Sequence, residues 1–171
     1  MPLAQLLLPE FDEEMANTRR LLACVPDGKT TWKPHDLSMK LGRLATHIAE
    51  IPGRWVVITL TKDEFDVRPP GPPPQRVTLE STAEILALFD KSTADARRSL
   101  EATSDADFEK SFTMLAGGKP YVTKARFAMY RRMAISHLIH HRAQLGVYLR
   151  INGVAIPGMY GPSADDLAKS R

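Results

Sequence analysis

The sequence predicts an all-α fold: a four-helix bundle with long connections and, in one interpretation, a short β-hairpin before the last helix. Four stretches repeat apolar residues at the three- and four-residue spacing of an amphipathic helix. Two irregular stretches, at 61–77 and after Asp105, interrupt that pattern. The chain has 171 residues, of which 43% are hydrophobic, so we expect a single domain over residues 1–171 with a packed core.

The first helix is expected over residues 4–25. Acidic residues lie near its start and Arg19 and Arg20 near its end, which suits the helix dipole. Pro9 is expected to delay the start of the helix, and Pro26 to end it. The residues that recur at helical spacing are Leu7, Leu8, Phe11, Met15, Thr18, Leu21, Leu22 and Val25.

The second helix is expected to begin at Ser38, whose hydroxyl suits an N-cap. His47 lies within its broad apolar face. Pro52 and Gly53 are expected to bend or break the helix. Residues 54–60 are interpreted as a continuation of a kinked helix, although their β-branched and aromatic side chains suit a strand equally well.

The connection over residues 61–77 contains a run of prolines at 69–74 that favours an extended segment. Ser81 and Glu84 have the spacing of a capping box and begin the third helix. Further on, residues 111–115 and 121–123 are able to pair as a short hairpin across a Gly-Gly turn.

The fourth helix is expected from about residue 124 to Ile151, and it contains three of the five histidines. His137 and His141 are four residues apart, so they share one face of the helix. Ile135 and Ile139 lie about 160° and 200° away, which makes the opposite face apolar too. Either a second subunit, giving a homodimer, or the tail over residues 154–162 is expected to cover that face. Ser163 is expected to cap a last short turn.

Composition argues against several classes of function. The 23 basic and 20 acidic residues leave a net charge of only +3, without a basic stripe interleaved with aromatics, so nucleic acid is not an expected partner. No apolar run approaches the length of a membrane span, and the N-terminus lacks the basic region of a signal peptide. We therefore expect a cytoplasmic protein without membrane contact. Cys24, the single cysteine, is interpreted as a packing residue, with a reactive thiol as the alternative.

Three histidines form the candidate metal site. His47, His137 and His141 lie on the core faces of two helices, and helix bundles build metal sites from side chains of facing helices. Three imidazoles leave coordination positions open, as in catalytic sites, and suit a divalent ion such as Zn or Ni. The alternative is that each histidine is satisfied by partners within the core. Because ligation needs neutral imidazoles, we expect release of the metal below a pH of about 6.

Other polar residues near these histidines have no single interpretation. Three share the histidine face and either hydrogen-bond a substrate or satisfy one another within the bundle: Tyr130, Gln144 and Tyr148. His140 is expected at the flank of that face, and His35 in a solvated loop. Arg142 points about 140° away from His137 and is expected to pair with an acid elsewhere.

Three segments, residues 38–52, residues 137–144 with the form His-x-x-His-His-Arg-x-Gln, and residues 152–165, resemble the DinB family of small bacterial proteins. The resemblance implies an up-down-down-up four-helix bundle, often dimeric. It also implies a divalent metal held by histidines that match His47, His137 and His141. Better understood members of the family are thiol-dependent transferases or isomerases that use bacillithiol, mycothiol or glutathione.

The function expected from the sequence is a metal-dependent enzyme, most simply an S-transferase that joins a low-molecular-weight thiol to a small electrophilic substrate. A hydrolytic version requires a general base, and Glu50, about 60° from His47 around its helix, is the acid closest to the histidine face. The alternative is a non-catalytic metal-binding protein, or a stress-related binding protein built on a helical bundle.

Overall fold

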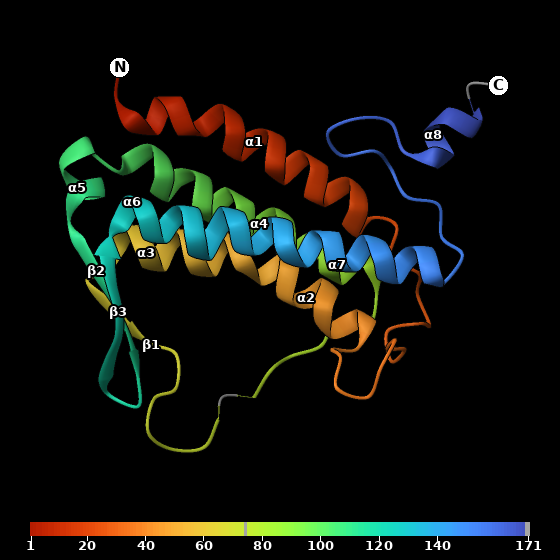
Figure 1. The fold of residues 1–171 in the computed structure, drawn as a ribbon, viewed down its shortest axis with the longest axis horizontal. Helices are drawn as coiled ribbons and strands as arrows, with labels where there is room; N and C mark the ends of the chain where they lie inside the picture. Colours follow the sequence, from red (N-terminus) through yellow and green to blue (C-terminus); the bar gives the residue numbers. More distant parts are fainter. Residues whose placement is uncertain (74, 170–171) are drawn as a thin grey trace.

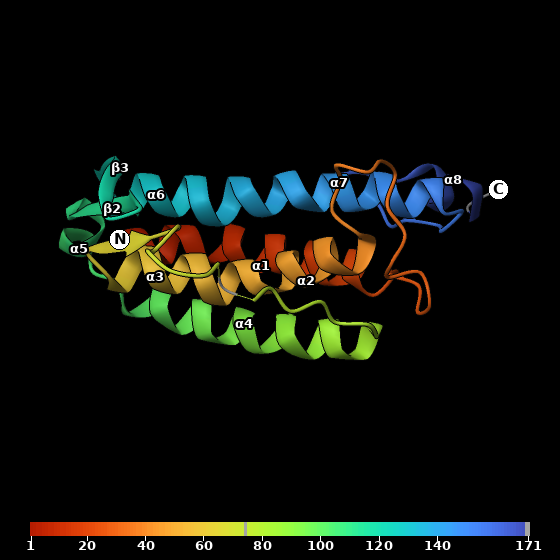
Figure 2. The same ribbon diagram turned by 90° about the horizontal axis from the view of Figure 1, so that it is seen from below.

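A computed structural model describes residues 1–73 and 75–169, and these form a bundle of long helices with a small sheet at one end. The four long helices lie side by side (Figures 1 and 2). They are α1 (Leu3–Leu22), α2 (Leu41–Ile51), α4 (Thr82–Ala102) and α7 (His137–Ile151). The predicted helical bundle is therefore confirmed in its main elements, whereas a purely α class is too narrow. The up-down-down-up order of the helices stays a prediction.

Helix α1 begins at Leu3 and runs through Pro9, so the expected delay at this proline is wrong. Leu7 and Phe11, on either side of Pro9, are buried in the core. Burial of these two side chains outweighs the hydrogen bond that a proline removes from a helix.

Helix α2 begins at Leu41, and the expected cap at Ser38 is wrong. The first two amides of the helix instead donate to backbone carbonyls of the preceding connection: Leu41 N to Trp32 O at 2.8 Å, and Gly42 N to Thr30 O at 2.9 Å. A Cβ at position 42 would lie only 2.7 Å from Thr30 Cβ. The glycine therefore permits the close approach that lets backbone carbonyls replace a side-chain cap.

Two π-helical segments interrupt the long helices, and both lie next to histidine-bearing turns. Helix α2 passes through η1 (Pro52–Val56) into α3 (Val57–Thr61), so the helix continues past Pro52 with the wider π-helical turn. Helix α6 (Arg126–Met129) passes through η2 (Tyr130–Ser136) into α7. Single-turn π segments of this kind occur frequently at functional sites.

The capping box that begins α4 is confirmed: Ser81 Oγ accepts from Glu84 N at 3.2 Å, and the Glu84 carboxylate accepts from Ser81 N. Helix α5 (Asp105–Glu109) follows α4. The last helix, α8 (Ala164–Lys169), has the expected cap, since Ser163 Oγ accepts from Asp166 N.

The hairpin is confirmed and belongs to a three-stranded sheet. Strand β2 (Ser111–Ala116) pairs antiparallel with β3 (Lys119–Ala125), and Gly117 and Gly118 turn the chain with φ angles of 64° and 74°. Strand β1 (Glu64–Asp66) pairs parallel with β2 and was not anticipated. The Asp66 carboxylate accepts from the amides of both glycines, which ties the end of β1 to the hairpin turn.

A buried ion pair fixes α7 against α1. The Arg142 guanidinium lies 2.7 Å from the Glu14 carboxylate, and their side chains are 3% and 8% exposed. Arg142 also donates to Thr18 Oγ1 at 3.1 Å and to the Tyr160 hydroxyl at 2.5 Å. The expectation that Arg142 pairs with an acid is confirmed.

The tail after α7 covers part of the second apolar face of that helix. Val154, Ile156 and Met159 pack against the core, and Tyr160 meets Arg142. Of the two coverings considered for this face, the tail is therefore present, while the second subunit stays a prediction. In the two described ranges, no helix combines the length and the apolar character that crossing a membrane requires.

The substitution Arg142→Met is expected to lower the free energy of unfolding by about 3–5 kcal/mol, because it leaves the Glu14 carboxylate buried without its positively charged partner. Urea denaturation followed by circular dichroism measures this. The double variant Glu14→Met/Arg142→Met removes both charges and is expected to be more stable than Arg142→Met alone. A double variant that is less stable than the single one would contradict this account.

Candidate metal centre

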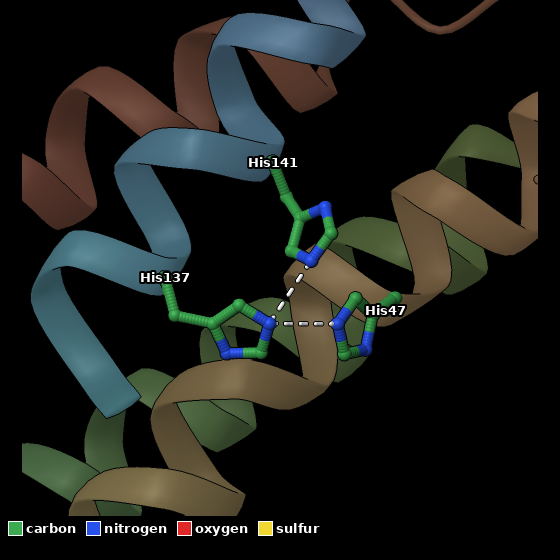
Figure 3. A group of neighbouring side chains, drawn as sticks. All are labelled: His47, His137 and His141. Carbon is green, nitrogen blue, oxygen red and sulfur yellow. Dashed lines mark hydrogen bonds between the residues drawn. The ribbon is translucent and has the colours of Figure 1, made fainter. Parts of the chain in front are cut away.

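Three imidazoles from two helices converge at the middle of the bundle. His47 comes from α2, and His137 and His141 come from successive turns of α7 (Figure 3). The Nε2 atom of His137 lies 3.3 Å from His47 Nε2 and 2.9 Å from His141 Nε2. One nitrogen from each ring falls within a group no more than 4.8 Å across, which is the metal-ligand cluster found among the described residues. The structure thus brings together all three residues that the sequence nominated.

The local fold explains this convergence. The four-residue spacing of His137 and His141 places them on one face of α7. Opposite them, His47 is flanked on α2 by Thr46 and Ile48, which are both fully buried. The three histidines themselves are only partly buried. Rigid packing around partly exposed ligands is the arrangement that a metal centre with access to a substrate requires.

The hydrogen bonds of the Nδ1 atoms determine where the protons lie. His137 Nδ1 lies 3.2 Å from the Met133 carbonyl, and His141 Nδ1 lies 2.7 Å from Gln144 Oε1. Carbonyl oxygens only accept, so both Nδ1 atoms donate. In a neutral imidazole the Nε2 atom then carries a lone pair and no proton. His47 Nδ1 faces the Glu50 carboxylate at 3.8 Å, which favours the same tautomer.

Lone pairs that face one another without a proton fit a cation. For metal–nitrogen bonds of about 2.0–2.1 Å, nitrogens at tetrahedral positions are about 3.3–3.4 Å apart, and those at adjacent octahedral positions about 2.8–3.0 Å. The two Nε2 separations of 3.3 and 2.9 Å lie within the range that pairs of nitrogens on one ion span, and one nitrogen of each ring lies within 4.8 Å of the other two. The donor set therefore fits a divalent transition metal. Binding of the metal itself stays a prediction.

Electrostatics favour the neutral form of the two imidazoles on α7. Burial, aided by the neighbouring His141 and His47, lowers the pKa of His137 to about 4. Burial also lowers the pKa of His141, against the opposing effect of its hydrogen bond to Gln144. Neutral rings are the form that ligates metals, so the site is ready to bind one at neutral pH.

Glu50 and Arg43 support His47 from the same helix. Burial alone would raise the pKa of Glu50, but hydrogen bonds from His47 and Arg43 outweigh it and lower the pKa to about 2. Arg43 holds the Glu50 carboxylate at 2.8 Å. Glu50 was expected near the histidine face from the sequence, whereas Arg43 was not. The available signal was the spacing of Arg43, His47 and Glu50, which share one helix face.

A cleft of about 570 Å³ opens beside His47 and His137. Trp55 forms part of its wall, with its ring centroid 6.5 Å from that of His137. Glu50, Arg54 and Arg68 also line it. A small molecule in this cleft would contact the imidazoles from the open side of the cluster.

Gln144 acts on the site through its hydrogen bond to His141, whereas two of the other residues considered lie apart from it. Tyr148 packs edge-on against Trp32, with ring centroids 5.5 Å apart. Tyr130 is fully buried, and burial raises its pKa. Its hydroxyl lacks a hydrogen-bond partner among the described residues.

The remaining histidines and the cysteine lie outside the cluster. His140 is exposed, beside the ring of His141. His35 is exposed in a loop, where its Nδ1 accepts from Leu37 N at 3.1 Å. Burial raises the pKa of the Cys24 thiol, which favours packing over reactivity.

Known proteins resemble this chain over most of its length. The sequence is 24% identical over 164 residues to the uncharacterized protein YrdA of Bacillus subtilis (strain 168), covering 95% of this chain and 90% of that protein. The fold is similar to that of a DinB-like protein from Bacillus cereus ATCC 10987, with a TM-score of 0.69 and 21% identity over 90% of this chain and 95% of the other. It is also similar to the DinB-like protein YjoA from Bacillus subtilis, with a TM-score of 0.68 and 18% identity over 90% of this chain and 96% of the other.

The two solved structures show only that the fold is shared with this chain. The evidence for a relationship in sequence comes from a family model. The model of the DinB superfamily matches residues 10–145, a range that contains His47, His137 and His141. The helical bundle, its histidine-bearing helices and this match together show that the chain belongs to the DinB superfamily.

Proposed function

We propose that the protein is a metal-dependent enzyme in which His47, His137 and His141 hold one divalent ion, Zn or Ni. The observation that carries this proposal is the set of three Nε2 atoms facing one another with their Nδ1 protons directed outward. An all-imidazole set suits these metals, and three protein ligands leave positions open for other molecules.

The reaction that we propose is the transfer of a low-molecular-weight thiol to a small electrophile. When bound, the ion supplies Lewis acidity, which lowers the pKa of a thiol or water that joins its open positions. The surrounding residues favour a thiol. Glu50, the acid beside His47, is held in an ion pair with Arg43 and is not free to act as a general base. A thiol ionises at a pKa of about 8.5, far below that of water, and needs such a base much less.

The other residues of the site orient the imidazoles. The Met133 carbonyl and the Gln144 amide fix the rings of His137 and His141 through Nδ1. Carbonyl and carboxylate partners of this kind raise the basicity of a ligand histidine and hold its tautomer. Glu50, anchored by Arg43, does the same for His47.

The assembly that we propose is a homodimer of up-down-down-up bundles in the cytoplasm, acting on a small molecule and without a nucleic-acid partner. The support for a dimer is the apolar surface that the tail leaves uncovered on α7. Val147 and Ile151 on this helix are 59% and 60% exposed. Burial of these side chains against a second copy would remove apolar surface from water.

Elemental analysis of protein purified without added metal is expected to find about one divalent ion per chain. His47→Gln, His137→Gln and His141→Gln are each expected to lose most of that metal, because two imidazoles bind a divalent ion much more weakly than three. His140→Gln is the matched control, since this exposed residue lies on the same helix outside the cluster. Equal metal content in all four variants would exclude this site.

Activity is tested with metal-loaded protein, the thiols glutathione, bacillithiol and mycothiol, and the electrophile monochlorobimane, whose conjugate is fluorescent. We expect turnover with at least one thiol and a loss of at least about a hundredfold in His137→Gln, because the ion supplies most of the activation of the thiol. If no thiol reacts, or if the variant matches the unaltered protein, the transferase proposal is wrong.

The stability of the metal-free protein is expected to fall as the pH decreases from about 6.5 toward 4. The unfolded chain protonates His137 near pH 6.5, whereas the folded chain resists protonation until a pH of about 4. Protons therefore favour unfolding within this window, and the contribution of His137 is complete above it. Metal occupancy is expected to fall over the same range.

Urea denaturation of chelator-treated protein at pH 7.5, 6.5 and 5.5 measures this dependence, in a range where carboxylates contribute little. His137→Gln is expected to reduce the slope of stability against pH. His35→Gln is the control and is expected to leave the slope unchanged. A slope that is the same in His137→Gln and the unaltered protein would contradict the prediction.

A further inference from the structure

The cleft beside His47 and His137 concentrates the positive charge of the chain. Its charged lining consists of Arg43, Glu50, Arg54, Arg68 and Arg76. These five groups carry a formal charge of +3, which equals the net charge of the whole chain, so nineteen basic and nineteen acidic residues balance elsewhere. A cavity lined by one sign of charge raises the local concentration of molecules of the opposite sign.

Arg43 is the one arginine of this lining that is already engaged. It donates to the Glu50 carboxylate and to the Val77 carbonyl, each at 2.8 Å. Its side chain is only 14% exposed. Arg43 therefore fixes the wall of the cleft and neutralises Glu50, the single acid in the cleft lining. The remaining arginines determine the net charge of the cleft.

The side chains of the other three arginines have neither a hydrogen-bonded nor an ionic partner among the described residues. Across residues 1–73 and 75–169, the arginine side chains with neither a hydrogen-bonded nor an ionic partner are Arg54, Arg68, Arg76 and Arg132. Three of these four line the cleft. Arg54 comes from η1, while Arg68 and Arg76 come from the connection between β1 and α4, an open loop that is visible in Figure 1. Two separate segments, η1 and the connection between β1 and α4, thus bring unpaired guanidinium groups to one cavity.

The guanidinium of Arg54 is positioned by aromatic rings. Its central carbon lies 5.4 Å from the ring centroids of both Trp55 and Phe65. Trp55 is 6% exposed and also neighbours the ring of His137. Cation–π contact with the rings leaves the N–H donors of the guanidinium without a hydrogen-bond partner, and such donors suit bidentate binding of an acid group. Arg54 thus lines the same cleft as His47 and His137, with its guanidinium against aromatic rings.

We propose that this cleft recognises a small molecule with two or more acid groups, carboxylate or phosphate, which Arg54, Arg68 and Arg76 bind while its reactive end lies at His47 and His137. The inference rests on the proposed function and names the chemical class of its substrate. Planar guanidinium groups pair with both kinds of acid through parallel hydrogen bonds. A volume of about 570 Å³ accommodates a ligand of that size.

Isothermal titration calorimetry of the metal-loaded full chain tests the proposal with two probes, tricarballylate and inorganic phosphate, and with glycerol as an uncharged control. We expect saturable binding of at least one acid, no binding of glycerol, and affinity that falls as sodium chloride is raised. Arg54→Gln, Arg68→Gln and Arg76→Gln are each expected to weaken binding about tenfold or more, because each removes a charge-assisted pair. The probe that binds identifies the acid group.

Arg132→Gln is the matched control, since it removes an equally exposed and unpartnered arginine outside the cleft. Loss of binding in the three cleft variants and its retention in Arg132→Gln would support the proposal. Equal weakening in all four variants, or binding of neither acid, would overturn it.

The same titrations on chelator-treated protein separate this inference from the proposed function. Binding that persists without metal and depends on the three arginines supports an acid-recognition site, even if the catalytic tests fail. Binding that disappears with the metal and ignores the arginine substitutions reports coordination by the ion alone, and it overturns the inference while leaving the metal site intact.

Discussion

The arrangement of the three imidazoles depends on an ion pair on the other side of the same helix. Arg142 follows His141 directly in the sequence, and it reaches Glu14 of α1 while the ring of His141 lies against that of His47 on α2. Removing a buried charge from its partner is costly, so α7 is unable to turn or slide without breaking this contact. The polar anchor and the histidine face are therefore two sides of one rigid element.

The features that the sequence predicted correctly are those that neighbouring residues determine. The spacing of His137 and His141 is enough to place both on one face of a helix. The capping box of Ser81 and Glu84 fixes the start of α4 through contacts over three residues. For His47, the apolar stripe around it predicts that the side chain faces the core, but it does not predict which residues of other helices lie next to it. The structure supplied those neighbours.

The features that the sequence concealed depend on contacts between distant segments. Strand β1 has only three residues, and its pairing with β2 gives no local periodicity. The start of α2 at Leu41 relies on the carbonyls of Thr30 and Trp32, which accept from the first amides of the helix. Ser38 has the chemistry of an N-cap residue but does not cap this helix. The charged cleft gave no local signal either, because Arg43 and Arg54 lie on α2 and η1 whereas Arg68 and Arg76 lie in the connection before α4, and only the fold brings them together.

The π-helical segment from Tyr130 to Ser136 sets the rotational phase of the long helix. A π turn spans one residue more than an α turn, and each residue of an α-helix advances about 100° around the axis. If this segment wound as an ordinary α-helix of the same length, the part that meets the sheet would be rotated by about that angle relative to α7. With the sheet end held in place, His137 and His141 would then point away from His47. The order of residues alone does not make the centre: on an unbroken α-helix His137 and His141 would still share one face, but that face would not meet His47.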